Sequence, residues 1–286
     1  MPGELPSFDL VVATVGRVDE LERLLASLGR QTHPRFRVLV TDQNDDDRLA
    51  PVLAAHATLE LVHLRASPGL SRARNAALPH VTADLVAFPD DDCAYPEGLL
   101  EQVAARFAAS AALDGLSGRV VGHDGWSAPS WRPDAALLAR DNLWNRANAG
   151  AIFLRRHVVE RVGAFDERLG LGSGEPWSSG EEIDYLIRAL AAGARIEYDP
   201  ELTVTHDEKR LTPDALRARG YRDGASVGYL LRKHRYPART LARMLVRPAG
   251  GAVLALARGD LAAARVHAAT LRGRLAGYRG AGGRTR

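Results

Sequence analysis

The sequence predicts an α/β fold with a mainly parallel sheet flanked by helices, followed by a basic helical extension at the C-terminus. Short apolar runs alternate with helical patterns through the first 107 residues. Strand patterns stop after His206, where the charge of the chain also changes sign. The composition, 46% hydrophobic and 26% charged, is that of a globular protein and excludes a wholly disordered or fibrous chain.

Four strand–helix pairs account for the first 107 residues. The expected strands cover 8–15, 36–41, 59–64 and 85–88. The expected helices cover 18–30, 46–56, 70–79 and 96–107. Ligands of parallel sheets bind beyond the carboxyl ends of the strands, and these ends carry polar residues or glycine at 14–17, 42–44, 65–69 and 90–92.

The following part of the chain is less regular. Strands are expected at 115–122, 149–155, 196–198 and 202–205, and a helix at 181–192. Residues 170–180 contain four glycines and three serines, a composition typical of a mobile loop. From Pro213 the pattern is helical, with breaks expected at Pro237 and around 248–251.

The charge distribution divides the chain into two expected domains, 1–208 and 209–286. The second contains 18 Lys and Arg but 3 Asp and Glu, a net charge of +15, whereas the first carries −12. Such asymmetry predicts that the basic part faces an anionic surface. Arginines recur every seven residues from Arg258 to Arg279 beside a small apolar stripe. This helix either lies on an anionic membrane or packs on the first domain, and both interpretations stay open.

The cellular location is predicted from the lack of paired cysteines, of a signal peptide and of a membrane span in the sequence. Cys93 is the single cysteine, so no intrachain disulfide can form. Residues 1–8 do not resemble a signal peptide, and no apolar stretch approaches the ~20 residues of a membrane span. We expect a cytoplasmic protein, with peripheral contact at the inner face of the membrane as an alternative.

The strongest local signal is the run Asp90, Asp91 and Asp92 directly after an expected strand. In an extended chain the first and third carboxylates point the same way and suit Mg²⁺ or Mn²⁺ bridging to a diphosphate. Three adjacent like charges also repel one another unless a cation is present. The alternative is a solvated acidic turn before the helix that begins near Pro96.

A second acidic cluster, Glu181, Glu182 and Asp184, opens the helix after the glycine- and serine-rich loop. One of these carboxylates could act as a general base on an acceptor hydroxyl, beneath a loop that closes. The alternative is stabilisation of the helix dipole by negative charge. Trp177 either stacks on a sugar ring or packs as a structural plug.

Two further features suggest anion or metal contacts. His206 ends the last expected strand, where it could contact a metal or pyrophosphate, although a single histidine is more often structural. Arg72, Arg74 and Asn75 begin a helix beside an expected sheet end, which suits a phosphate site. The alternative for these arginines is the surface of an amphipathic helix.

Six segments in order resemble an inverting family 2 glycosyltransferase of the GT-A fold. The resemblance runs from about residue 8 to residue 206, roughly 70% of the chain. The segments are VVATVGRVDELERLLASLGRQ, VLVTDQNDDD, GLSRARNAAL, VAFPDDD, GEEIDYLIRALAAG and PELTVTH.

This resemblance implies a nucleotide-diphosphate sugar donor, a divalent cation (Mn²⁺ or Mg²⁺) and single-displacement transfer with inversion. The acceptor would be a hydroxyl-bearing saccharide, lipid-linked saccharide or small natural product. The implied donor-binding residues are Thr14, Val15, Arg17, Asp42, Asn44, Arg72, Arg74, Asp90, Asp91, Trp177 and Glu181. The implied metal ligands are Asp90, Asp92 and His206.

The catalytic base of the family is usually the Asp of a Glu-Asp pair. Here the pair is Glu181-Glu182, so the resemblance implies Glu182 as base, with Asp184 as the alternative.

Rival functions explain less of the sequence. A nucleotidyltransferase would need a glycine-rich basic loop after the first strand, where this chain has only Gly16 within 15–18. A protein that binds nucleic acid or another anionic surface through the basic extension is the rival from another class. Its tail has few aromatic residues and no recognised motif, so we expect no nucleic acid partner. Homodimer formation stays open.

Overall fold

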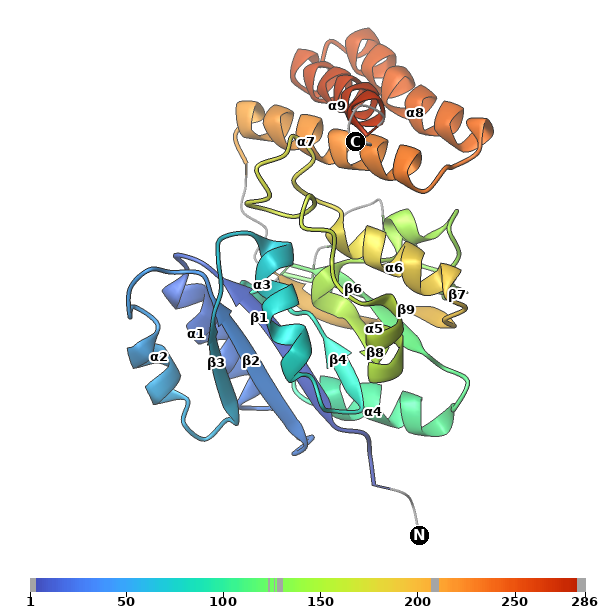
Figure 1. Cartoon of the computed structure of the whole chain (residues 1–286). Helices are drawn as coiled ribbons and strands as arrows, with labels where there is room; N and C mark the ends of the chain where they lie inside the picture. Colours follow the sequence, from blue (N-terminus) through green and yellow to red (C-terminus); the bar gives the residue numbers. More distant parts are fainter. Residues whose placement is uncertain (1–3, 123, 126, 128–130, 207–210, 282–286) are drawn as a thin grey trace. The chain divides into compact units, whose positions relative to one another are not determined.

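The computed structural model describes residues 4–122, 124–125, 127, 131–206 and 211–281. The chain divides into two compact units (Figure 1). Unit 1 comprises Met1–Phe165 and Tyr185–Glu208, and unit 2 comprises Asp166–Asp184 and Lys209–Arg286. The segment Asp166–Asp184 therefore groups with the basic C-terminal part, while the boundary expected at residue 208 stays a prediction.

Unit 1 is built on one mixed sheet with the strand order β3-β2-β1-β4-β8-β6-β9-β5, and β7 also pairs with β9. The strands β3, β2, β1 and β4 are parallel, which confirms the predicted α/β class. β8 runs antiparallel to β4 and β6, and β9 runs parallel to β6. The strands are β1 (Phe8–Thr14), β2 (Phe36–Asp42), β3 (Leu61–Arg65), β4 (Leu85–Ala87), β5 (Cys93–Ala94), β6 (Gly115–Val121), β7 (Ala136–Leu137), β8 (Ile152–Arg155) and β9 (Ile196–His206).

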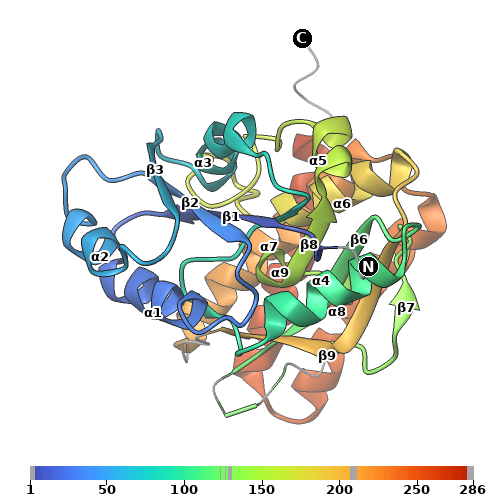
Figure 2. The ribbon, with the colours of Figure 1, turned by 90° about the horizontal axis from the view of Figure 1, so that it is seen from below.

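Helices cover both faces of this sheet (Figure 2). Side chains of α1 (Val18–Leu28), α2 (Ala50–Ala55) and α4 (Leu99–Ala109) form one apolar core with Leu10 and Val12 of β1. Val11 points to the other face, because successive strand residues alternate. There the sheet packs against α3 (Leu70–Ala77), α5 (Arg156–Val162) and the part of α6 (Glu181–Ala191) that belongs to unit 1. Single 3₁₀ turns occupy Leu78–His80, Leu143–Asn145 and Ala149–Ala151.

The last strand corrects the sequence prediction. Asp199-Pro200 does not separate two strands, because β9 runs unbroken from Ile196 to His206. The pairing of β9 with β6 shifts register between Ser117 and Arg119, which absorbs the extra residues. At Gly118 a Cβ would lie 2.3 Å from the carbonyl oxygen of Leu202, so glycine allows the strands to meet there. The start of the strand expected at 149–155 is also a 3₁₀ turn, and β8 begins at Ile152.

Unit 2 contains α7 (Pro213–Lys233), α8 (Ala238–Ala257) and α9 (Leu261–Gly280). α7 and α9 approach closely through glycines. A Cβ at Gly224 would lie 2.4 Å from the carbonyl oxygen of Thr270, and one at Gly277 would lie 1.8 Å from that of Ala225. α9 therefore packs on α7 within unit 2.

The predicted break at Pro237 is confirmed, whereas the break predicted around 248–251 is wrong. α8 continues through Pro248. Proline lacks the N–H that would bond to the carbonyl four residues earlier, that of Met244. Arg274 of α9 donates a hydrogen bond to the Met244 oxygen instead. The side chain thus replaces the missing backbone bond, and the helix stays continuous.

Candidate active site

The three aspartates form a turn between β4 and β5. The backbone N–H of Cys93 donates a hydrogen bond to the carbonyl oxygen of Asp90 at 3.1 Å. Asp90 also forms an isolated parallel β-bridge with Ala13 of β1. The expectation that the run is extended is therefore wrong, because Asp91 and Asp92 form a turn. This acidic turn (Asp90–Asp92) lies at the carboxyl end of β4, where α/β sheets bind ligands.

Cationic side chains contact every carboxylate of the acidic turn. Arg17 Nη1 lies 2.7 Å from both Asp91 Oδ1 and Asp92 Oδ2. Arg74 Nη2 lies 3.0 Å from Asp90 Oδ1, and His206 Nε2 lies 3.1 Å from Asp92 Oδ1. Mutual repulsion of the aspartates therefore does not by itself require a metal ion, because the protein supplies compensating charge.

The two aspartates bound by Arg17 titrate in opposite directions. Burial raises the pKa of Asp91, and the guanidinium of Arg17 only partly offsets this. Burial alone would also raise the pKa of Asp92. The pKa is nevertheless lowered overall, because His206 contributes a hydrogen bond and a charge and Arg17 contributes a second charge. Asp92 thus remains an anion that orients the His206 ring.

Asp90, Cys93 and His206 form a metal-sized cluster among the described residues, with one potential ligand atom each, all within 4.8 Å of one another. The register of β5 on β9 pairs Cys93 with His206, which brings the histidine to the acidic turn. Burial and the nearby carboxylates raise the pKa of Cys93 well above its usual value, so its thiol is a poor ligand for a hard cation. The carboxylate of Asp90 is the kind of oxygen ligand that Mn²⁺ and Mg²⁺ prefer, the ring of His206 is a softer nitrogen ligand, and Asp92 lies beside them through its contact with His206.

The end of β2 organises the loop after β1. Asp42 is fully buried, and its Oδ1 accepts hydrogen bonds from the backbone and side-chain nitrogens of Asn44 at 2.9 and 2.7 Å. Asn44 Oδ1 in turn accepts from the N–H of Gly16 at 2.7 Å. Gly16 has a φ of +67°, which favours glycine, and it lies between Val15, 53% exposed, and Arg17. Within this loop the Thr14 hydroxyl donates to the Arg17 carbonyl oxygen at 3.4 Å.

Two residues of β3 hold Asp42, a role that the sequence did not predict for either, although Arg65 begins the expected strand end at 65–69. Asp42 Oδ2 lies 2.9 Å from His63 Nε2 and 2.9 Å from Arg65 Nη1, both on β3. Burial alone raises the pKa of Asp42, but the hydrogen bonds from Asn44 and His63 and the charge of Arg65 lower it overall. Strand alternation could have revealed this pair, because residues two apart on a strand point to the same face of the sheet. Arg65 pairs with Asp42 in the register of β2 and β3, and His63 lies two residues before it.

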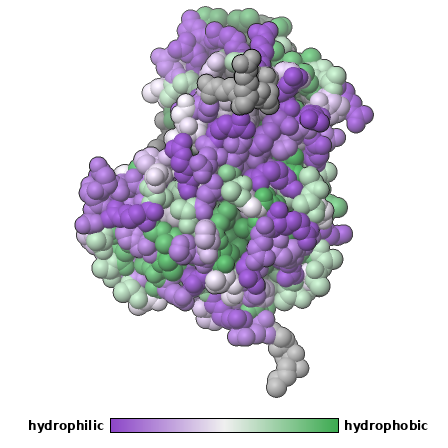
Figure 3. Space-filling model, in the orientation of Figure 1, coloured by the Kyte–Doolittle hydropathy of each residue, from purple (hydrophilic) through white to green (hydrophobic). Residues whose placement is uncertain are grey.

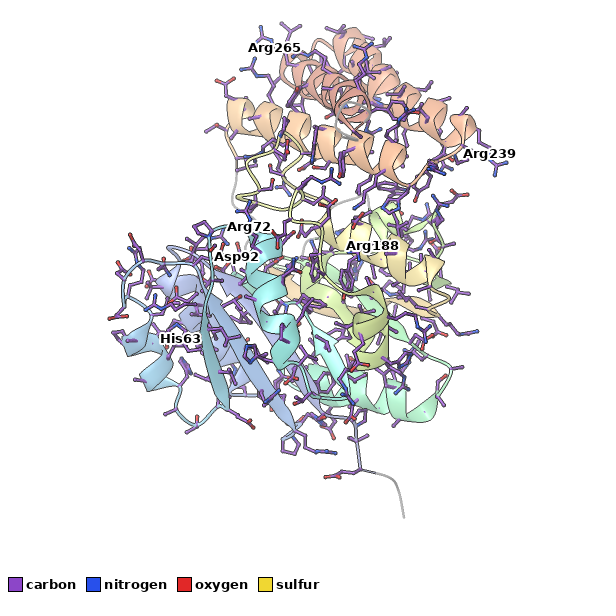
Figure 4. The ribbon with its side chains drawn as sticks, viewed as in Figure 1. His63, Arg72, Asp92, Arg188, Arg239 and Arg265 are labelled. Carbon is purple, nitrogen blue, oxygen red and sulfur yellow. The ribbon has the colours of Figure 1, made fainter. Side chains whose placement is uncertain are left out.

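The arginines of α3 have different environments. Arg74 is 1% exposed and its guanidinium lies over the rings of both Phe88 and Phe165, so it holds Asp90 from inside unit 1. Arg72 is only partly buried, and its Nη1 donates to the Pro68 carbonyl oxygen at 2.5 Å. Figure 4 shows Arg72 at the same edge of unit 1 as Asp92. Of the two, Arg72 is the one that an incoming anion can reach.

The second acidic cluster lies at the start of α6, in unit 2. Asp184 is fully buried, and its Oδ1 lies 2.6 Å from Lys233 Nζ and 2.7 Å from His234 Nε2. Glu181 is 5% exposed, whereas Glu182 is partly exposed. Asp184 therefore anchors the first turn of α6 to the end of α7, and Glu182 is the carboxylate of this cluster that has exposed surface.

Trp177 packs inside unit 2. Its ring is 6% exposed and stacks on Tyr229 with centroids 4.7 Å apart and an interplanar angle of 15°. On α9, a Cβ at Gly280 would lie 2.6 Å from the indole. These contacts favour the structural-plug interpretation over stacking on a sugar. Nearby, Ser179 is bonded to Ser226 of α7 at 2.9 Å between hydroxyl oxygens.

Comparisons with known proteins agree with this architecture. Residues 9–162 match the family model described as Glycosyl transferase family 2. The chain is 28% identical over 263 residues to the pre-mycofactocin glycosyltransferase of Mycobacterium tuberculosis, covering 86% of this chain and 51% of the relative. It thus spans about half the length of that relative. It is 30% identical over 248 residues to the succinoglycan biosynthesis protein ExoM of Rhizobium meliloti, covering 81% of this chain and 77% of ExoM.

Two solved structures share the fold. The mannosyltransferase PcManGT from Pyrobaculum calidifontis, solved in complex with GDP-Man and Mn²⁺, superposes with a TM-score of 0.64 at 17% identity, covering 96% of this chain and 88% of that one. S. aureus TarS 1-349 in complex with UDP-GlcNAc gives a TM-score of 0.61 at 17% identity, covering 94% and 92%.

Proposed function

The chain belongs to glycosyl transferase family 2 and has a GT-A fold, and from this premise we propose that it transfers a sugar from a nucleotide-diphosphate sugar to an acceptor hydroxyl with inversion. The observation that carries the proposal is the acidic turn with Arg17, Arg74 and His206 at the carboxyl end of β4. It combines anionic and cationic groups where a donor diphosphate and its counter-ion can bind.

The donor diphosphate is proposed to bind at the acidic turn. Asp90 and His206 would hold a divalent cation, Mn²⁺ or Mg²⁺, with Asp92 orienting the His206 ring. When bound, such a cation supplies positive charge to the leaving diphosphate. Arg17 keeps Asp91 and Asp92 in place, and the partly exposed Arg72 is placed to meet a phosphate.

The nucleotide is proposed to bind at the ends of β1 and β2. Asp42 does not need to face the ligand for this role, because both of its oxygens are bonded to protein groups. It fixes Asn44 and, through Asn44, the loop that carries Val15 and Arg17. A nucleotide base would pack on the exposed Val15.

Glu182 is proposed as the general base. It accepts the proton of the acceptor hydroxyl while the acceptor oxygen bonds to the anomeric carbon and the bond from that carbon to the diphosphate oxygen breaks. A single displacement of this kind inverts the anomeric configuration. Supporting this assignment, Glu182 has exposed surface, whereas Asp184 is buried against Lys233 and His234.

The acceptor is proposed only as a class. Two relatives have different names, one a pre-mycofactocin glycosyltransferase and the other a succinoglycan biosynthesis protein. A saccharide, a lipid-linked saccharide and a small natural product therefore all remain acceptors that fit the proposal.

Release of nucleoside diphosphate from a panel of nucleotide-diphosphate sugars tests the proposal. The wild type should release one diphosphate faster with Mn²⁺ than with a chelator, and Asp90→Asn should lose at least about 100-fold in rate. The matched control is Asp141→Asn, which changes an exposed aspartate elsewhere in unit 1. No release from any donor in either condition would contradict the proposed activity.

A further inference from the structure

We propose that α8 docks unit 2 onto the surface of an anionic lipid bilayer, with the helix lying along the membrane. Ten large apolar side chains are exposed among the described residues, and half of them fall within sixteen consecutive positions of α8 and the start of α9. They are Val246, Val253, Leu254, Leu256 and Leu261, each 57–67% exposed. This set is named the apolar stripe. The proposal extends the membrane contact expected from the sequence, which was placed on the helix that is α9 in the structure. It does not depend on the transfer reaction.

Helical geometry places four members of the apolar stripe on the outward face of α8, while the fifth, Leu261, begins α9. Val246 and Val253 are seven residues apart and thus lie on nearly the same line along the helix. Leu254 and Leu256 flank that line on either side. The residues between them on this face, Gly250 and Ala257, are small, so nothing bulky separates the apolar side chains from a flat surface. In Figure 3 apolar residues (green) lie beside hydrophilic ones (purple) along the top edge of unit 2 in this view.

The charges around the apolar stripe select an anionic surface. α8 contains no Asp or Glu, and Asp260 is the only acidic residue in the sequence from 224 to 286. Arg239, Arg243 and Arg247 are exposed on the first half of α8. Arg239, like Arg265 of α9, extends away from the ribbon (Figure 4). Arginines beside inserted apolar side chains bind lipid phosphates while their stems stay in the apolar layer.

The same charges argue against a second copy of the chain as the occupant. A symmetric dimer through α8 would bring two sets of arginines together without carboxylates from that helix to pair with them. A lipid bilayer with anionic headgroups has no such conflict. The occupant to which the structure points is therefore the membrane surface.

α8 lies on the membrane in this proposal and does not cross it. Contrary to the expectation from the sequence, α8 is by length and composition long and apolar enough to span a bilayer, and 22% of its most apolar 18-residue window is buried. Its inner face, however, packs on α9. A Cβ at Gly251 would lie 2.8 Å from the His267 ring, and Arg274 donates to the Met244 carbonyl oxygen. Spanning would break these contacts and would also carry Arg243 and Arg247 into the hydrocarbon.

Co-sedimentation of the full chain with vesicles tests the proposal. The wild type should sediment with phosphatidylcholine vesicles that contain phosphatidylglycerol, and high salt should release it. Replacing both Val253 and Leu256 by Asp should weaken binding at least about tenfold. Each of Arg239→Gln and Arg243→Gln should weaken it about fivefold. Leu171→Asp is the matched control, because Leu171 is equally exposed, at 57%, on another segment of unit 2, and it should bind like the wild type.

A fluorescent label at one position gives a second test that does not depend on whether the Asp variants fold. Cys93 is buried, so Leu256→Cys would offer one accessible thiol for an environment-sensitive fluorophore. Its emission should shift to the blue when anionic vesicles are added, and should not shift with phosphatidylcholine alone. Failure of the wild type to sediment at low salt would overturn the proposal. So would equal binding by the Val253/Leu256 variant, or a dimer in solution that this variant abolishes.

Discussion

At the scale of single residues, the two acidic clusters use their carboxylates differently. In the acidic turn, Arg17 bridges Asp91 and Asp92, whereas Asp90 pairs with the buried Arg74 and lies with His206 in the cluster proposed to hold a cation. At the start of α6, Lys233 and His234 hold Asp184, which leaves Glu182 with exposed surface. In each cluster the residues proposed for chemistry are distinguished from their neighbours by the partners that the fold supplies.

This difference predicts separate effects for two conservative variants. Glu182→Gln should lower the transfer rate by about 100- to 10,000-fold and leave donor binding intact, because only the proton acceptor is lost. Asp184→Asn should instead lower the free energy of unfolding, because it leaves Lys233 and His234 facing a neutral group in a buried site. Transfer assays and urea denaturation of both variants separate the two roles. Full activity in Glu182→Gln would remove it as the base.

Burial of one histidine predicts a dependence of stability on pH. His33 is 2% exposed, and burial lowers its pKa. The unfolded chain therefore takes up a proton near pH 6.5 that the folded chain resists, so the free energy of unfolding falls as the pH drops below that value. The loss from this group is at most about 1.4 kcal/mol per pH unit.

The matching variants are His33→Phe and His80→Gln, the second at an exposed histidine. Urea denaturation at pH 7 and pH 5 should show a smaller difference for His33→Phe than for the wild type. His80→Gln should retain the wild-type difference. An unchanged pH dependence in His33→Phe would mean that other groups cause the loss.

At the scale of elements, sequence patterns predicted those whose periodicity is local. β1 and α1 lie within two residues of their expected bounds, because an apolar run and a helical stripe need no distant partner. Asp199-Pro200 misled the prediction, because the register shift at Ser117 and Arg119 on another strand keeps β9 continuous. Pro248 misled it for the same kind of reason, since Arg274 of α9 satisfies the Met244 carbonyl. The two-residue strand β5, which brings His206 to the acidic turn, has no periodicity of its own.

The packing of α7 on α9 predicts opposite effects for two glycine variants. Gly224→Ala would place a Cβ 2.4 Å from the carbonyl oxygen of Thr270, and the resulting shift of two helices should cost about 1–3 kcal/mol. Gly250→Ala meets nothing within 4 Å on the outer face of α8 and should stabilise by about 0.5–1 kcal/mol. Chemical denaturation of the full chain measures both. Equal stability of the two variants would contradict the close approach of α7 and α9.

At the scale of the whole molecule, the charge split in the sequence corresponds only in part to the two units. The basic extension lies in unit 2, but so does Asp166–Asp184. That segment is joined to α7 by the ion pair of Asp166 with Lys233 at 2.7 Å and by Trp177 on Tyr229. These partners lie more than fifty residues apart, so composition could not reveal them. The sequence correctly predicted the α/β class of unit 1, because its strand and helix patterns are local, while the donor-binding residues placed there stay a prediction.

The central claim is that unit 1 binds a nucleotide-diphosphate sugar at the acidic turn. A thermal-shift screen tests it most directly, with nucleoside diphosphates and nucleotide-diphosphate sugars added in the presence and absence of Mn²⁺. One nucleotide should raise the melting temperature by about 5 °C in the presence of Mn²⁺, and much less with a chelator. His206→Ala should lose that metal-dependent difference. If no nucleotide changes the melting temperature in either condition, the assignment of a donor site to the acidic turn is wrong.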